Sequence, residues 1–304
     1  MRNLISVLCL LAAGLLAAAT LAGHQVDQLL REEQPVQHIA GSLPEDPAFS
    51  AAVTETIMEE SIARLPEGVQ QFVPGGVENM IRPVISSALD SDRTTAAWDE
   101  VLQTTRSDYA AQLEQIFAEG TGGDPRELDV TMDLTPVTDA MTQPLRERLE
   151  STLGMVPGLN AETFEVPTPT IEIDLEAATD DSADPYTWAT AAAASEHWMI
   201  FGISSAVLTA LGMVVGSPRL RWIGLASGAA LAAGIGLWIA TTVAAPSFQQ
   251  PAGLTDAESA MLEHIQTRFT DWAQPDWWIF TGVAGFVVAV AVLAAIVTPA
   301  RREH

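Results

Sequence analysis

Residues 277–300 read WWIFTGVAGFVVAVAVLAAIVTPA, a run that contains no charged side chain. A helix rises about 1.5 Å per residue, so roughly 20 apolar residues cross a hydrocarbon core about 30 Å thick. Residues 4–22, 198–216 and 222–245 form three similar runs, and none of the four contains Asp, Glu, Arg or His. Because a helix satisfies its own backbone hydrogen bonds in lipid, the sequence predicts four transmembrane helices.

The arginines around these runs predict an orientation. They precede the first span, fill the short turn between the second and third, and follow the fourth: Arg2, Arg219, Arg221, Arg301 and Arg302. Basic residues near span ends favour the cytoplasmic side. We therefore expect a multi-pass plasma-membrane protein with both termini in the cytoplasm and a large extracytoplasmic region.

Tryptophan gives an independent indication of the membrane boundaries, because its ring prefers the headgroup level of a bilayer. Every tryptophan except Trp98 lies at or near a predicted span end: Trp188, Trp198, Trp222, Trp238, Trp272, Trp277 and Trp278. Core filling is the alternative role of such a ring. The shared position along the chain favours a membrane-interface belt.

Composition excludes one class of partner. The formal net charge of −25 comes from 39 acidic residues against only 14 basic ones, all of them arginine. Affinity for nucleic acid depends on Lys and Arg contacts to phosphate, so we expect no nucleic-acid partner. The single cysteine, Cys9, lies inside the first span and allows no intramolecular disulfide.

The spans divide the chain into six parts. Residues 1–23 form an N-terminal transmembrane anchor, with a cleaved signal peptide as the alternative because small residues surround Ala22. Residues 24–176 form the extracytoplasmic domain and 177–197 a linker with a lead-in helix. Residues 198–245 form a transmembrane hairpin, 246–276 an exterior loop with an amphipathic helix, and 277–304 the last span with a short tail.

The extracytoplasmic domain is predicted to be helical with a small β element. Asp46-Pro47 is typical of a helix start, and a long helix is capped near Ser91 and Asp92 and stopped by glycines from Gly120. Residues 128–134 and 171–176 alternate apolar with polar side chains, as half-buried strands do. The fold class is therefore a mainly α membrane protein with four transmembrane helices and an extracytoplasmic helical domain.

Several short motifs resemble a known group of proteins. They are Asp46-Pro47-Ala48-Phe49, Leu65-Pro66, Trp98-Asp99-Glu100 and the segment 130–137, VTMDLTPV. Together with an anchor before them and three spans after them, they resemble widespread actinobacterial integral membrane proteins of unknown function. The resemblance covers nearly the whole chain and implies architecture and location, without an activity. Many relatives carry Asn and His soon after the Trp-Asp-Glu motif. Residues 101–109 here read VLQTTRSDY, so no role of that His carries over.

Catalytic and transport signatures are absent from the sequence. No Gly-x-Ser-x-Gly, phosphate loop or His-Glu-x-x-His motif occurs, and the histidines are scattered: His24, His38, His197, His264 and His304. Ion-coupled transporters commonly carry ionisable groups inside their spans, and these spans have none. We therefore predict neither an enzyme nor a cofactor.

Two sets of residues are candidates for a binding or packing role. If the two strands pair with their polar faces together, a Ca²⁺ ion would relieve the repulsion among Asp129, Asp133, Glu172, Asp174 and Glu176. The alternative is that these carboxylates only face water. Small residues at helical spacing favour close helix packing, either within the bundle or against another membrane protein: Gly202, Ala206, Gly224, Gly228, Ala232, Gly282 and Gly285.

These observations favour a non-enzymatic membrane protein whose exterior domain scaffolds or binds cell-envelope partners. The partners expected are the lipid bilayer and another membrane or envelope protein. A first alternative is that the exterior domain binds a lipid or small apolar ligand between its helices, which a large apolar cavity would favour. A second is a membrane hydrolase or transferase, which requires Asp, Glu or His side chains that converge near the bilayer.

Overall fold

The computed structural model describes residues 2–51, 54–55, 83, 87–89, 91–120, 129–141, 170–174, 185–246 and 256–298. Four long helices lie side by side: α1 (Arg2–Arg31), α10 (Trp198–Val215), α11 (Pro218–Trp238) and α12 (Asp256–Val297). All four are long and apolar enough to cross a membrane, with α11 continued by a π-helical turn, η5 (Ile239–Val243). The chain is therefore a multi-pass membrane protein of mainly α fold, as predicted.

Close helix packing rests on glycines that α1 and α11 share. A Cβ atom added at Gly14 would collide with the backbone of Gly228, and one added at Gly228 would collide with the backbone of Leu10. Gly224 likewise lies against Leu10 and Val7, while Gly202 on α10 lies against Thr20. Small residues let two backbones approach in lipid, where no hydrophobic driving force brings helices together. This part of the predicted packing stripe therefore packs the protein's own bundle, and Ala232 is buried there too.

Three residues of the predicted packing set do not serve this purpose. A Cβ atom at Gly282 or Gly285 would meet nothing within 4 Å, and Ala206 is exposed. On α12 the buried alanines are Ala273, Ala284, Ala291 and Ala295, and the last three recur at helical spacing within the span. Gly282, Gly285 and Ala206 therefore do not pack the protein's own bundle, and their alternative role of packing against another membrane protein stays a prediction.

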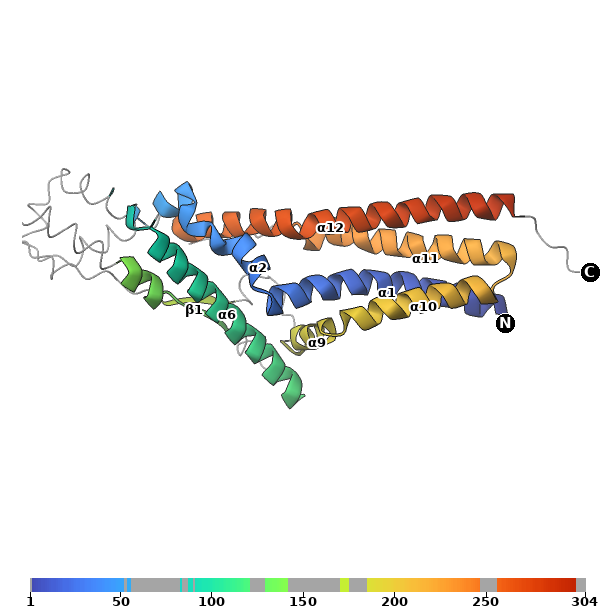
Figure 1. The fold of residues 1–304 in the computed structure, drawn as a ribbon, viewed down its shortest axis with the longest axis horizontal. Coiled ribbons are helices and arrows are strands. Elements are labelled where there is room, and N and C mark those ends of the chain that lie inside the picture. The colour runs from blue at the N-terminus through green and yellow to red at the C-terminus, as the bar shows by residue number, and fades with distance from the viewer. Residues whose placement is uncertain are drawn as a thin grey trace, which may run out of the picture.

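Two of the membrane helices continue far beyond their apolar parts. Helix α1 reaches Arg31, and α12 runs without a break from Asp256 to Val297 with Pro275 inside it. At about 1.5 Å per residue, the 42 residues of α12 span roughly 63 Å. The predicted amphipathic helix and last span are therefore one element, and the boundary placed at residue 276 is not a structural break. In Figure 1, α12 runs horizontally, and its left end lies beside the membrane-distal elements.

The membrane-distal elements form a small core against these extensions. They include α2 (Glu33–Val36), the π-helix η1 (Gln37–Gly41), the 3-10 helix η2 (Leu43–Glu45) and α6 (Asp92–Glu119). Leu43, Trp98 and Leu102 are buried together, with Met261 of α12 packed against them. The indole N–H of Trp98 donates to the carbonyl of Ala40 at 2.7 Å. Trp98, the one tryptophan outside the predicted belt, is therefore a core residue.

The predicted helix boundaries in this region are largely confirmed. Ser91 caps α6 through the backbone N–H of Thr94, and Gly120 ends it with a φ of 66°. Asp46 accepts hydrogen bonds from the backbone N–H groups of Ala48 and Phe49, so a helix does start at Pro47. Most of the helical pattern predicted between Phe49 and Leu89, and the part beyond Met141, lies outside the described residues.

The two predicted strands pair antiparallel, and their register places the polar positions of one strand opposite those of the other, so the Ca²⁺ site stays a prediction. Strand β1 (Asp129–Asp133) runs antiparallel to β2 (Thr170–Asp174), with Asp129 opposite Asp174, Thr131 opposite Glu172, and Asp133 opposite Thr170. The Asp133 carboxylate accepts hydrogen bonds from Thr135, which lower its pKa. Glu176 lies outside the described residues. Among the residues that the structure describes, no three potential ligands converge on a metal site.

Candidate functional site

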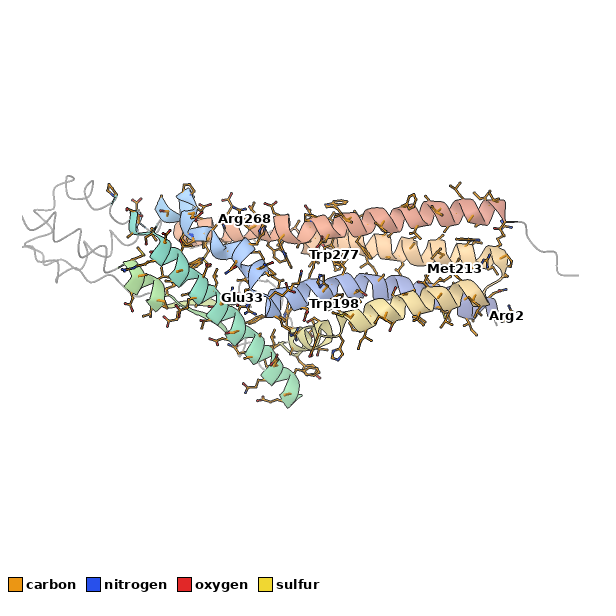
Figure 2. The ribbon with its side chains drawn as sticks, in the orientation of Figure 1. Arg2, Glu33, Trp198, Met213, Arg268 and Trp277 are labelled. Atoms are coloured by element: carbon orange, nitrogen blue, oxygen red, sulfur yellow. The ribbon has the colours of Figure 1, made fainter. Side chains whose placement is uncertain are left out.

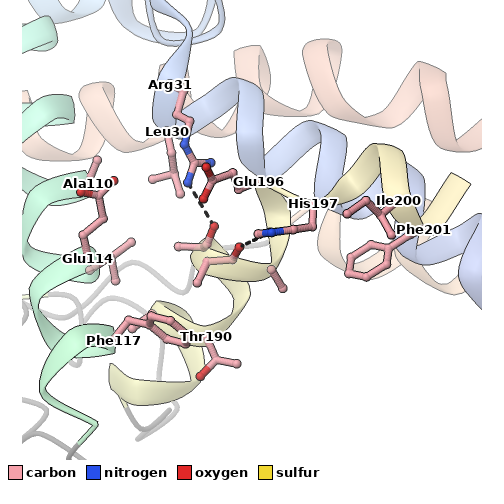
Figure 3. A pocket seen from close by; sticks show the side chains of 15 residues that line it. Leu30, Arg31, Ala110, Glu114, Phe117, Thr190, Glu196, His197, Ile200 and Phe201 are labelled. Atoms are coloured by element: carbon pink, nitrogen blue, oxygen red, sulfur yellow. Dashed lines mark hydrogen bonds between the residues drawn. The ribbon is translucent and has the colours of Figure 1, made fainter. Parts of the chain in front are cut away.

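A groove lies where the bundle meets the membrane-distal elements. It has a volume of about 750 Å³ and lies between the end of α1, the helices α6 and α9 (Pro185–Ser195), and the first turn of α10. Figure 3 shows Phe117 and Thr190 at one end and Ile200 and Phe201 at the other. The groove therefore begins on a helix that is apolar enough to span a membrane and ends outside the spans.

Apolar side chains make up the floor of this groove. Leu113 of α6 and Ala189 and Ala192 of α9 are buried in one cluster, and Leu30 and Tyr109 pack against it. Burial raises the pKa of the Tyr109 hydroxyl, so it stays protonated. The α9 sequence explains the opening, because the run of alanines from 191 to 194 leaves space that larger side chains would fill. This arrangement suits an aliphatic ligand.

The charged side chains of the groove lie at its rim. The Arg31 guanidinium donates to the Asp27 carboxylate at 2.6 Å, to the Ser195 hydroxyl at 3.2 Å and to the Ala192 carbonyl at 3.4 Å. Arg31 thereby joins α1 to α9 and holds one wall of the groove. Glu114, Glu196 and His197 are exposed around the opening. Charges of both signs thus surround an apolar interior.

A second constellation unites residues that are far apart in the sequence. His264 of α12 faces Asp46 through Nδ1, at 3.0 Å from Oδ2, and faces Ser42 through Nε2, at 3.4 Å from Oγ. The imidazole is nearly buried, with 9% of the His264 side chain exposed, while Ser42 is half-buried between η1 and η2. The other Asp46 oxygen accepts the two backbone N–H groups at the helix start, and the Phe49 hydrogen bond is the main cause of its lowered pKa. Hydrogen bonds therefore fix the Asp46 carboxylate in place.

Sequence reasoning missed this second constellation. Asp46 was recognised only as a helix cap, and His264 only as one of five scattered histidines. The relevant signal was the position of His264 in the predicted amphipathic helix, about one turn from Met261, which packs against the membrane-distal core. Only the packing of α12 on η1 and η2 shows which residue it meets.

A third polar contact ties α1 to α12 at the membrane boundary. The Trp277 indole N–H donates to the Gln25 side-chain oxygen at 2.7 Å, and the Gln25 amide donates to the Ala273 carbonyl at 3.1 Å. The neighbouring Gln274 amide donates to the carbonyl of Ala240 in η5. Trp277 is 1% exposed, which corrects its assignment to the interface belt: its ring fills the core and does not face headgroups.

The remaining tryptophans of the predicted belt differ in exposure, and the described topology arginines lie at one end of the bundle. Trp188, Trp238 and Trp278 are exposed, while Trp198, Trp222 and Trp272 are half-buried. Figure 2 shows Trp198 and Trp277 at one level along the bundle and Arg2 near its opposite end. Arg2 donates to Val215, just before the turn that leads to Arg219 and Arg221. Arg301 and Arg302 lie outside the described residues.

No family model, no curated protein and no solved structure matches this chain.

Proposed function

We propose that the protein is a plasma-membrane protein that binds the aliphatic part of a lipid-like amphiphile in the groove between α6, α9 and α10. The groove volume of about 750 Å³ falls within the range of roughly 300 to 1,000 Å³ of ligand sites, which are mostly apolar with a few polar groups. The position of the groove at the first turn of a span carries the proposal. A hydrocarbon chain could enter there from the bilayer without crossing water.

The rim supports an amphiphile over a purely apolar ligand. Arg31 and His197 can donate hydrogen bonds there, whereas Glu114 and Glu196 can accept them. A zwitterionic or neutral polar headgroup fits this mixture better than a strongly anionic one, because two exposed carboxylates would repel added negative charge. The groove walls are mainly alanine, leucine and phenylalanine, so we propose binding and not catalysis at this place.

Photo-crosslinking tests the proposal directly. The full-length protein would be reconstituted in phosphatidylcholine vesicles that contain a diazirine-labelled palmitate, irradiated, and mapped by peptide mass spectrometry. Ala193 lines the groove, whereas Ala191 on the same helix is exposed and does not line it. We expect Ala193→Trp to lower crosslinking to α6 and α9 at least tenfold and Ala191→Trp to leave it unchanged. Equal labelling of both variants would contradict groove binding.

We further propose that the membrane-distal region faces the extracytoplasmic side and both termini face the cytoplasm. Arg2 and the turn before Arg219 lie together, since the Asn3 side chain accepts the backbone N–H of Ser217 at 3.1 Å. One end of the bundle therefore gathers the basic residues that favour the cytoplasmic side. A cysteine introduced at Ser107 should react with an impermeant maleimide added to intact cells. Labelling only after lysis would contradict this orientation.

A second candidate function is a scaffold for envelope partners, and the continuity of the helices favours it. Helices α1 and α12 pass from the spans into the membrane-distal core, and Gln25 and Trp277 link them at the boundary. Such a support would hold the distal surface at a fixed height above the bilayer. Crosslinking in cells from exposed α6 positions should then capture a stoichiometric partner, and exclusively self-derived or lipid products would count against scaffolding.

A further inference from the structure

We infer that Ser42 is an activated nucleophile for acyl transfer, with His264 as its general base and Asp46 as the residue that positions the imidazole. This activity lies beyond the proposed groove binding and uses different residues. The structure assigns the roles by which nitrogen faces which oxygen: Nδ1 of His264 faces the Asp46 carboxylate, and Nε2 faces the Ser42 hydroxyl. A serine, histidine and aspartate in this order are recognised by geometry and role on unrelated folds, whatever their order in the chain.

The two contacts of His264 determine its proton arrangement. A carboxylate only accepts hydrogen bonds, so Asp46 requires a proton on Nδ1. In the neutral imidazole, Nε2 is then free to accept the Ser42 proton. The distance of 3.4 Å from Ser42 Oγ is long for a hydrogen bond, as catalytic contacts often are before substrate binds. The distance of 3.0 Å to Asp46 Oδ2 already fixes the ring.

The residues around this triad hold its aspartate and its serine in place. The second oxygen of Asp46 is held by the backbone N–H groups of Ala48 and Phe49, so the carboxylate cannot turn away. Leu43, next to Ser42, is fully buried and anchors the turn that carries the serine. Ser42 itself keeps partial access to solvent, as a nucleophile requires. A helix cap alone would need neither His264 nor Ser42.

The chemistry that this arrangement supports is hydrolysis of a carboxylic ester. Ser42 Oγ would bond to the acyl carbon while its proton passes to Nε2 of His264. The ester C–O bond then breaks, and the leaving alcohol takes that proton. Water attacks the acyl-serine in the same way, giving the carboxylic acid and the free serine. No redox partner or metal is required, and water is the only co-reactant.

A fluorophosphonate probe tests the nucleophile without knowledge of the substrate. It forms a Ser–O–P bond with loss of fluoride and reacts with activated serines. On the full-length protein in dodecyl maltoside, we expect one adduct at Ser42, absent in Ser42→Ala and retained in Ser107→Ala, whose serine is exposed on α6. His264→Gln should slow labelling at least tenfold. Asp46→Asn should slow it too while it keeps a good helix cap.

A second measurement remains informative if the His264 variants are less stable. A cysteine at position 42, made by Ser42→Cys, can be alkylated by iodoacetamide, and Cys9 is the only other thiol. Pairing with the imidazole should make this thiol react at pH 7 at least tenfold faster than in Ser42→Cys/His264→Gln. Its rate should also rise at a lower pH than in the double variant. Absence of a Ser42 phosphonate adduct in the wild type, or equal alkylation rates, would overturn the inference.

Discussion

The hydrogen bond between Trp277 and Gln25 should contribute measurably to stability, and a double-mutant cycle can isolate its contribution. Trp277→Phe removes the indole N–H and leaves the Gln25 oxygen without that donor. Gln25→Leu removes both the acceptor of Trp277 and the donor to the Ala273 carbonyl. The double variant removes both partners, so the cycle separates the shared hydrogen bond from the cost of each substitution alone.

The expected magnitude follows from the burial of both side chains. An unpaired buried polar group costs about 1–3 kcal/mol, and each single substitution leaves at least one. Interhelical hydrogen bonds in membranes have coupling energies that average about 0.6 and reach about 1.7 kcal/mol. Because Trp277 is 1% exposed and Gln25 is 7% exposed, water cannot replace the missing partner. We therefore expect a coupling energy of about 1 kcal/mol, toward the upper part of that range.

Unfolding in mixed micelles of dodecyl maltoside and dodecyl sulfate, followed by near-ultraviolet circular dichroism, gives the free energies. Trp238 provides the control, because its side chain is 60% exposed and lies on α11. The pair Gln25→Leu and Trp238→Phe should be additive. A Gln25–Trp277 coupling below about 0.3 kcal/mol, which is the usual error of additivity, would refute the reasoning.

Three further predictions use other parts of the structure. Gly228→Ala should destabilise the bundle by about 1–3 kcal/mol, because the backbone of α1 blocks the added methyl group, whereas Gly234→Ala meets nothing within 4 Å and should be neutral or stabilising in the same micelle assay. Gly120→Ala should lower the free energy of unfolding by about 1 kcal/mol, because alanine resists a φ of 66°; an unchanged midpoint would argue against that conformation. Phe49 and His264 hold the pKa of Asp46 below 3.8, so its contribution to stability is present above that pH and is lost as the pH falls through the lower folded-state pKa. Melting curves of Asp46→Asn should lack this acid-dependent loss.

The spans and the helix termini were predictable because their signals are local. Hydropathy over one helix length identifies each span, and the cap at Ser91 and the stop at Gly120 depend only on neighbouring backbone. The alternation at Asp129–Asp133 likewise predicted a strand. The register with β2 was not predictable, because it depends on which residue lies across the pair. That register places Asp129 opposite Asp174, and the proposed Ca²⁺ site remains a prediction.

The candidate sites depended on contacts that hydropathy does not encode. The alanines of α9 could have been simple helix formers, and they line a groove only because α6 crosses beside them. Trp277 lies at the end of an apolar run, as an interface residue would. Its ring is nevertheless buried, and its indole N–H donates a hydrogen bond to Gln25 of α1. The prediction failed there because adjacent tryptophans on a helix point in different directions.

The amino-acid sequence by itself determined that this chain is a mainly helical multi-pass membrane protein. Unpaired backbone groups are costly in lipid, and a helix pairs the backbone groups of a long uncharged segment within that segment. Only the tertiary structure decided that Ser42, Asp46 and His264 meet, and that α12 is one continuous support for them. Side chains about 220 residues apart come into contact through the packing of whole helices. No local pattern of residues records that packing.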